Sequence, residues 1–246
     1  MKRSLNELSS NIVETNDGKT ANVKDFLFDE KEWRIRYMDA DFGGLFTSKK
    51  ILIPKAFFKQ PPWESNIFPT EISSGDIENC PKVDDHLPVS REYENILHEH
   101  YELDPYWGTA YIATSGSFYP PRPIKTPEKD VKEENIESIL RSFKEIIGYK
   151  IKSLTDVFGQ IDDILIDDVD WQIVYLVIDT KSWVPWSKRV IIAVDWLDEI
   201  SYTKHMVKLN LTTESIKDAP EFVMEKLVDE KFEKSVFDFY HSSLLK

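Results

Sequence analysis

Cysteine, glycine and long apolar runs are all scarce in this chain of 246 residues. The single cysteine, Cys80, excludes an intrachain disulfide and any metal site built from cysteines alone. No stretch reaches the ~20 consecutive apolar residues that a membrane helix needs, and the N-terminus turns polar at once, unlike a secretory signal. These absences predict a cytoplasmic protein without membrane insertion.

Basic residues are also in the minority, with 31 Lys and Arg against 44 Asp and Glu, for a net charge of −13. Nucleic-acid binding depends largely on cations that neutralise phosphates, and anionic membrane surfaces attract the same side chains. We therefore expect neither nucleic acid nor a membrane as a partner. Aromatic residues, by contrast, make up 13% of the chain and include seven Trp.

The chain contains an internal repeat, which is the strongest pattern in the sequence. An offset of 138 residues aligns Trp33 with Trp171 and Asp25 with Asp163, with no gap over the span 3–41. After a shift of one residue the match resumes, and Ser48–Ile51 falls on Ser187–Val190. The two copies therefore cover roughly 3–81 and 141–220.

Each copy has the composition of a small β domain. Short segments rich in β-branched and aromatic residues predict five or six strands in about 80 residues, a number typical of a small closed or nearly closed β-barrel. The sequence thus predicts a mostly β protein with some α. We expect the chain to divide into four regions. These are barrel-like repeats at 1–82 and 141–220, a helix and a Pro- and aromatic-rich connector at 83–140, and a C-terminal helix at 221–246. Within these regions we expect a hairpin turn at Asp17-Gly18 and a helix over 87–103.

Two segments of the second copy resemble a known family. The run Arg-Ser-Phe-Lys-Glu-Ile-Ile-Gly at 141–148, followed by Gly-Gln-Ile-Asp-Asp-Ile-Leu-Ile-Asp at 159–167, resembles the start of a PRC-barrel domain. This family is named for the cytoplasmic domain of the photosynthetic reaction-centre H subunit, and a related domain ends the ribosome maturation factor RimM. The resemblance covers both copies, although Ala21 replaces the Gly that precedes the second strand. It implies a protein-contact module without catalytic residues.

Acidic residues of the second copy suggest a cation site. Hard cations such as Ca²⁺ take several carboxylate oxygens, and this copy groups its carboxylates at Asp162, Asp163, Asp167, Asp168 and Asp170. The group lacks the Gly and the distal Glu of an EF-hand loop, and matching Asp25 and Asp29 in the first copy favour turn-capping roles. We assign no catalytic residue, no metal ligand and no cofactor.

Exposed aromatic residues are the best candidates for a protein contact, because Trp and Tyr are enriched in interface hot spots. Trp183 and Trp186 lie in an expected loop between two strands, and they either contact a partner or plug a barrel end. Tyr106, Trp107 and Tyr111 lie in the connector, where packing between the repeats is the favoured interpretation.

The leading hypothesis is a non-enzymatic scaffold that binds a protein partner or forms a homodimer. The alternative is a small-molecule or calcium-like metal-binding module that uses the acidic turns or the cleft between the repeats.

Overall fold

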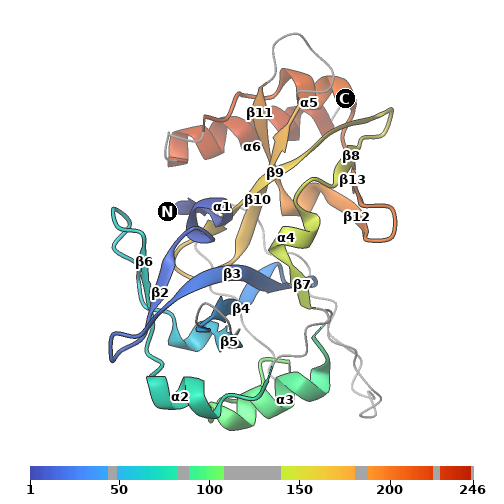
Figure 1. Ribbon diagram of the computed structural model, residues 1–246. Helices are drawn as coiled ribbons and strands as arrows, with labels where there is room; N and C mark the ends of the chain where they lie inside the picture. Colours follow the sequence, from blue (N-terminus) through green and yellow to red (C-terminus); the bar gives the residue numbers. More distant parts are fainter. Residues whose placement is uncertain (44–48, 83–88, 108–139, 181–187, 224–227, 245–246) are drawn as a thin grey trace.

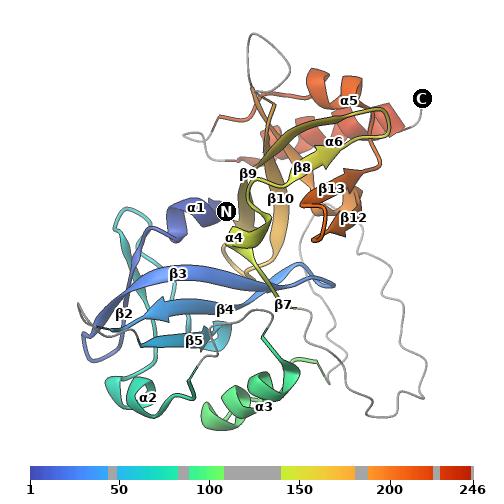
Figure 2. The ribbon, with the colours of Figure 1, turned by 45° about the vertical axis from the view of Figure 1, so that its right-hand side comes forward.

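The computed structural model describes residues 1–43, 49–82, 89–107, 140–180, 188–223 and 228–244. The strands of these segments form two separate mixed sheets, as Figures 1 and 2 show. The first sheet has the order β5-β4-β3-β2-β6, with β7 attached to β3. Its strands are β2 (Ile12–Glu14), β3 (Thr20–Asp29), β4 (Arg34–Asp41), β5 (Lys50–Pro54), β6 (Ile67–Pro69) and β7 (Leu140–Ser142).

The second sheet repeats this order as β11-β10-β9-β8-β13, extends it by β12, and carries β1 attached to β9. In both sheets the long central hairpin is antiparallel, and one short outer pair, β2–β6 or β8–β13, is parallel. The strands are β1 (Lys2–Ser4), β8 (Lys150–Lys152), β9 (Val157–Asp167), β10 (Ile173–Asp179), β11 (Arg189–Ala193), β12 (Leu197–Ser201) and β13 (Met206–Leu209).

A mostly β fold with some helices and two separate sheets is confirmed, but full closure of the expected closed or nearly closed barrels is not observed. Among the described residues, hydrogen bonds close neither sheet on itself, so each sheet has two edges. In the first sheet both edge strands end in a proline, Pro54 and Pro69. Just beyond these prolines the two edges meet at an isolated β-bridge between Phe58 and Thr70, where the Lys59 N–H donates to the Pro69 carbonyl over 3.1 Å.

The first strand of each repeat pairs with the sheet of the other repeat. Strand β1 runs antiparallel to β9, with Lys2 opposite Asp167 and Ser4 opposite Leu165. Strand β7 runs antiparallel to β3 in the matching register, with Ser142 opposite Leu27. Repeat and sheet therefore coincide everywhere except at these two strands, which are exchanged reciprocally.

Each sheet is covered by one longer helix, and these helices lie at opposite ends of the molecule in Figure 1. Helix α3 (Arg91–His100) buries Leu97 on the first sheet, and α6 (Glu230–Leu244) buries Val236 on the second. The expected C-terminal helix starts at Glu230, nine residues later than expected, and Phe222 forms a β-bridge with Arg189. None of the helices in the described segments is long and apolar enough to cross a bilayer.

The short helices also occur in matched pairs. Helices α1 (Leu5–Leu8) and α4 (Phe143–Ile146) follow the exchanged strands, and α2 (Ser74–Asn79) and α5 (Thr213–Asp218) follow the parallel outer strands. Single 3₁₀ turns occupy Lys55–Phe57 and Val194–Trp196. The expected hairpin turn is present between β2 and β3, where Gly18 adopts a φ of 84°.

Candidate functional site

Two matched turns bring the halves of the molecule together. Trp33 and Trp171 end the β3–β4 and β9–β10 turns with φ values of 56° and 63°, in the left-handed region that bulky residues rarely adopt. Their carbonyl groups accept hydrogen bonds across the junction: Ile35 N–H donates to Trp171 over 2.9 Å, and Ile173 N–H donates to Trp33 over 2.6 Å. The backbone strain at both tryptophans is thus held in place by pairing between the halves.

Each exchanged strand is fastened by a buried Ser–Asp contact. The Ser4 hydroxyl donates to the Asp163 carboxylate, and the Ser142 hydroxyl donates to that of Asp25. The same carboxylates accept the backbone N–H groups of Asn6 (3.1 Å) and Lys144 (3.2 Å). Burial raises the pKa of Asp163 to about 6 despite these donors, and it also raises the pKa of Asp25.

An arginine on each exchanged strand completes the junction. The Arg3 guanidinium lies 4.1 Å from the Trp63 ring centroid and 3.4 Å from the Asp168 carboxylate. At the matching place in the other half, Arg141 lies 3.9 Å from the centre of the Tyr202 ring and 2.8 Å from Glu30. The two arginines therefore make matching contacts in the two halves.

The acidic residues that suggested calcium are engaged in this junction. Asp167 pairs with Lys2 (2.7 Å), Asp168 with Arg3, and Asp170 with Arg34 (3.5 Å). Asp162 pairs with Arg189 over 2.6 Å, and Asp163 holds Ser4. Between the repeats, Trp171 lies 4.9 Å from Phe58 and 5.4 Å from Phe68. The side-chain contacts of Asp163, Asp167, Asp168 and Asp170 join the halves, whereas the Asp162 carboxylate pairs within the second half.

Tyr106 and Trp107, two of the predicted contact residues, pack against α3 in the first half. The Tyr106 hydroxyl donates to Glu94 Oε2 over 2.6 Å, and the Arg36 guanidinium lies 3.9 Å from the Tyr106 ring centroid. Trp107 lies with its ring 4.2 Å from the Arg91 guanidinium. Both side chains are half-buried, so each keeps part of its surface open to solvent.

Glu94 and His98 are buried at the centre of this cluster, which the sequence did not reveal. Glu94 is fully buried and pairs with Arg91 over 3.1 Å. The Nδ1 atom of His98 lies 3.1 Å from the Asp104 carbonyl and so donates, which leaves Nε2 to accept the Tyr37 hydroxyl at 2.9 Å. Burial lowers the pKa of His98, which favours this neutral form. The cluster fixes α3 and the start of the connector to the first sheet.

The other predicted contact residues, Trp183, Trp186 and Tyr111, lie outside the described residues. They stay predictions.

The parallel outer strand pairs are the clearest difference between the halves. In the first sheet Ile12 and Ile67 are direct neighbours on β2 and β6, and their side chains are 43% and 40% exposed. At the matching places in the second sheet, Lys150 and Met206 are neighbours on β8 and β13. One half therefore exposes an apolar strip where the other exposes a cation.

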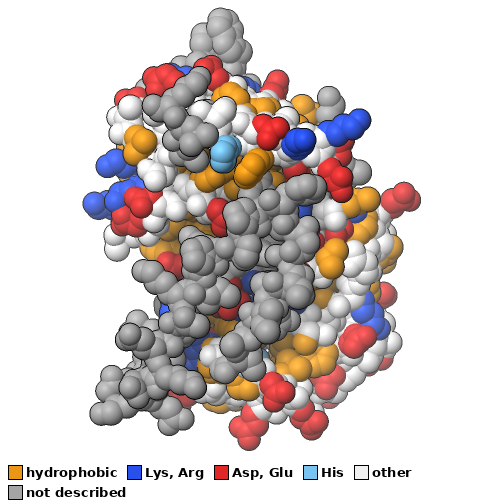
Figure 3. Space-filling view, turned by 180° about the vertical axis from the view of Figure 1, so that it is seen from behind, with side chains coloured by type: hydrophobic (Ala, Val, Ile, Leu, Met, Phe, Trp, Pro, Cys, Tyr) orange, Lys and Arg blue, Asp and Glu red, His pale blue; other side chains and the backbone are white. Residues whose placement is uncertain are grey.

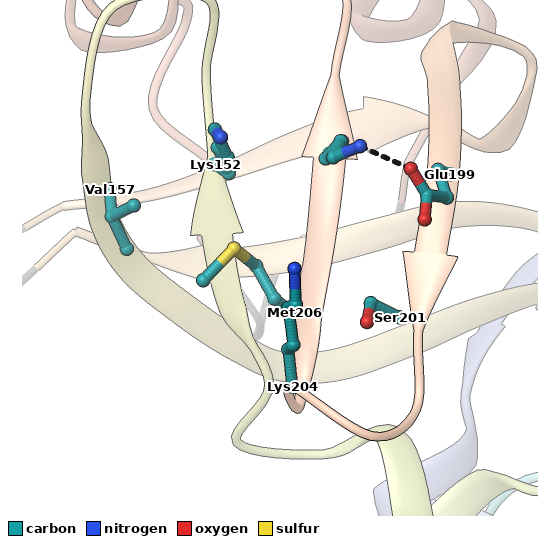
Figure 4. A pocket seen from close by; sticks show the side chains of 7 residues that line it. Lys152, Val157, Glu199, Ser201, Lys204 and Met206 are labelled. Atoms are coloured by element: carbon teal, nitrogen blue, oxygen red, sulfur yellow. Dashed lines mark hydrogen bonds and ion pairs between the residues drawn. The ribbon is translucent and has the colours of Figure 1, made fainter.

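A shallow hollow of about 170 Å³ lies on this face of the second sheet, as Figure 4 shows. Its lining combines cationic and apolar side chains around a single carboxylate. The lining residues are Lys152, Val157, Glu199, Ser201, Lys204, Met206 and Lys208. They come from β8, β9, β12, β13 and the β12–β13 turn, and Lys208 forms an ion pair with Glu199.

No protein-family model matches this chain, and no curated protein is significantly similar to it. The resemblance to PRC-barrel domains accordingly depends on the motif residues alone.

Proposed function

We propose that this chain is a non-catalytic scaffold that holds two β domains as one rigid pair and offers protein partners a different surface on each domain. The observation that carries the proposal is the contrast between the matched outer strand pairs. The Ser–Asp and arginine contacts at the junction are matched between the halves, whereas Ile12 and Ile67 are replaced by Lys150 and Met206 on the solvent side. Divergence at exposed positions is what separate binding surfaces would require.

The apolar strip of Ile12 and Ile67 supports a protein partner for the first domain. Single exposed apolar side chains are ordinary on protein surfaces. Two isoleucines in direct register on adjacent strands make a continuous patch, and contiguous apolar surface is characteristic of contact sites. The PRC-barrel resemblance supports the same role, because that family mostly serves in protein contacts.

The proposal is tested by affinity capture from the native cell with three forms of the full chain: wild type, Ile12→Lys and Lys150→Ile. Each variant installs the side chain that the other domain carries at the matching place, so each changes one surface and leaves the junction intact. We expect Ile12→Lys to lose a near-stoichiometric protein partner that the wild type and Lys150→Ile retain, with all three equally folded by circular dichroism. Capture of the same proteins by all three forms would contradict the role of the strip.

The predicted loop tryptophans are tested in the same experiment with a Trp183→Ala/Trp186→Ala variant. Loss of the partner in this variant, but not in Ile12→Lys, would place the contact in the loop. If the wild type captures nothing beyond itself, the scaffold proposal fails.

A further inference from the structure

The second sheet carries a cluster of lysines that the fold does not need. Lys150, Lys152, Lys204 and Lys208 lie on or beside the parallel pair β8–β13, and the first three are exposed. Lys152 and Lys208 are direct neighbours across the two strands. Like charges in such positions destabilise a sheet, so the arrangement has an electrostatic cost.

Two carboxylates, Glu199 and Asp198, offset only part of this charge. Glu199 bonds Lys208, which Asp198 also attracts, and the neighbouring lysines Lys204 and Lys152 also lower the pKa of Glu199. The hollow's lining therefore holds three lysines and one glutamate. This surplus of positive charge stands out in a chain of net charge −13. Acidic side chains (red) are widespread at the outline of the molecule in Figure 3.

The first domain shows that the fold does not require these lysines. The residues at the matching places of Lys152, Lys204 and Lys208 are Glu14, Ser65 and Pro69. Because the parallel strand pair forms in both domains, the sheet itself does not require these lysines.

We propose that the lysine face of the second sheet, defined by Lys150, Lys152, Lys204 and Lys208, binds an acidic segment of a protein partner. Charge complementarity carries the choice of an anion. The choice of a protein segment follows from the apolar side chains within the hollow, where Val157 is 45% exposed and the Met206 thioether lies between the lysines (Figure 4). A bare phosphate would leave these apolar groups in water, whereas a peptide that alternates acidic and apolar side chains covers them. This inference rests on the proposed scaffold function and names the partner chemistry of its second domain.

The test measures binding of the full chain to a short fluorescein-labelled peptide in which Glu alternates with Leu, by fluorescence anisotropy. The site variant is Lys152→Glu/Lys204→Ser, which installs the first domain's side chains. The matched control is Lys31→Glu/Lys59→Ser, which makes the same charge change at exposed lysines of the first domain. We expect binding to weaken about tenfold in the site variant and to change less than about twofold in the control. Added salt should weaken binding to the wild type, because exposed charge pairs are screened.

Equal affinity of both variants would overturn the proposal, because it would mean that the peptide responds only to net charge. Tighter binding of an oligothymidylate than of the peptide, lost in the site variant, would instead make the face a nucleic-acid site and would also overturn it. The capture experiment with Ile12→Lys concerns the other domain, so a failed peptide test leaves the scaffold function standing.

Discussion

The two domains are most alike where they face each other and least alike where they face solvent. At the junction, Ser4 and Ser142 hold Asp163 and Asp25 through the same set of donors. On the outer strands, the exposed pair of Ile12 and Ile67 is replaced by a lysine and a methionine. A contact that both halves must supply keeps its chemistry, while a surface that only one half uses is free to change.

The junction itself is not fully symmetric, and the largest expected effect tests this. Trp171 packs against Phe58 and Phe68 of the other half, whereas the Trp33 ring stacks on Phe28 of its own sheet at 5.4 Å. Trp171→Ala should cost about 3–5 kcal/mol of unfolding free energy in urea titrations. Trp33→Ala should cost less; it is the matched control, because both residues have the same strained backbone. An equal or greater cost for Trp33→Ala would contradict this account.

A glycine bulge distinguishes the second sheet from the first. Gly159 has a φ of 55°, and a Cβ placed there would lie 2.8 Å from the Asp179 carbonyl oxygen. In the first sheet Ala21 takes the matching place in regular pairing. Gly159→Ala should cost at least about 1–2 kcal/mol from backbone conformation alone, and more from the clash, as measured by thermal unfolding. The reverse change, Ala21→Gly, should cost about 0.5–1 kcal/mol. Similar costs for the two would show that the bulge carries no strain.

The Ser–Asp contacts should be energetically equivalent. Ser4→Ala and Ser142→Ala each deprive a buried carboxylate of one donor and a short helix of its N-cap. Each should lower the unfolding free energy by about 1–3 kcal/mol. Chemical denaturation of the two single variants and the double variant measures this, and costs that differ by more than about 1 kcal/mol would break the symmetry of the exchange.

The smallest effect concerns Asp39, which is partly buried on β4 where the second sheet has Val177. Burial and the nearby charge of Asp25 raise the pKa of Asp39 to about 6, and its Oδ1 atom has no hydrogen-bond partner. Since the unfolded chain takes up this proton only near pH 4, the folded state should gain stability as the pH falls from about 7 to about 4, and the gain should level off below that.

Asp39→Asn removes the titration. From pH 7 to pH 5, the unfolding free energy of the wild type should therefore rise relative to that of the variant by on the order of 1 kcal/mol. Parallel pH dependences of the two proteins would refute the assignment.

The sequence was sufficient to predict the repeat and the mostly β class, because hydrophobic patterning and a constant offset record them directly. It could not predict the strand exchange. Lys2–Ser4 and Leu140–Ser142 belong to similar copies, so each segment fits either sheet equally well by pattern. Only the three-dimensional structure shows which of the two sheets each segment joins.

The candidate sites were harder to foresee for a different reason. Lys152 and Lys208 are far apart in the chain and become neighbours only through a parallel strand pair that no turn signal announces. A comparison of charge at matching repeat positions, Glu14 with Lys152 for example, was the one signal that could have revealed the lysine face. Glu94 and His98 lie on a short helix of mixed composition. Its buried polar residues follow no simple periodic pattern, so the sequence did not show that they are buried.

The exchange of first strands also sets an order in time. Strand β1 leaves the ribosome long before its partner β9, which ends at Asp167. Likewise, β3 of the first sheet is fully paired only after the chain has been synthesised as far as Ser142, the end of β7. At the usual elongation rates of about 5–20 residues per second, the opening segment of the chain stays without its strand partner for roughly ten seconds or more. The first sheet therefore cannot be finished before the second repeat has begun, and the second sheet includes a strand made long before the rest of it.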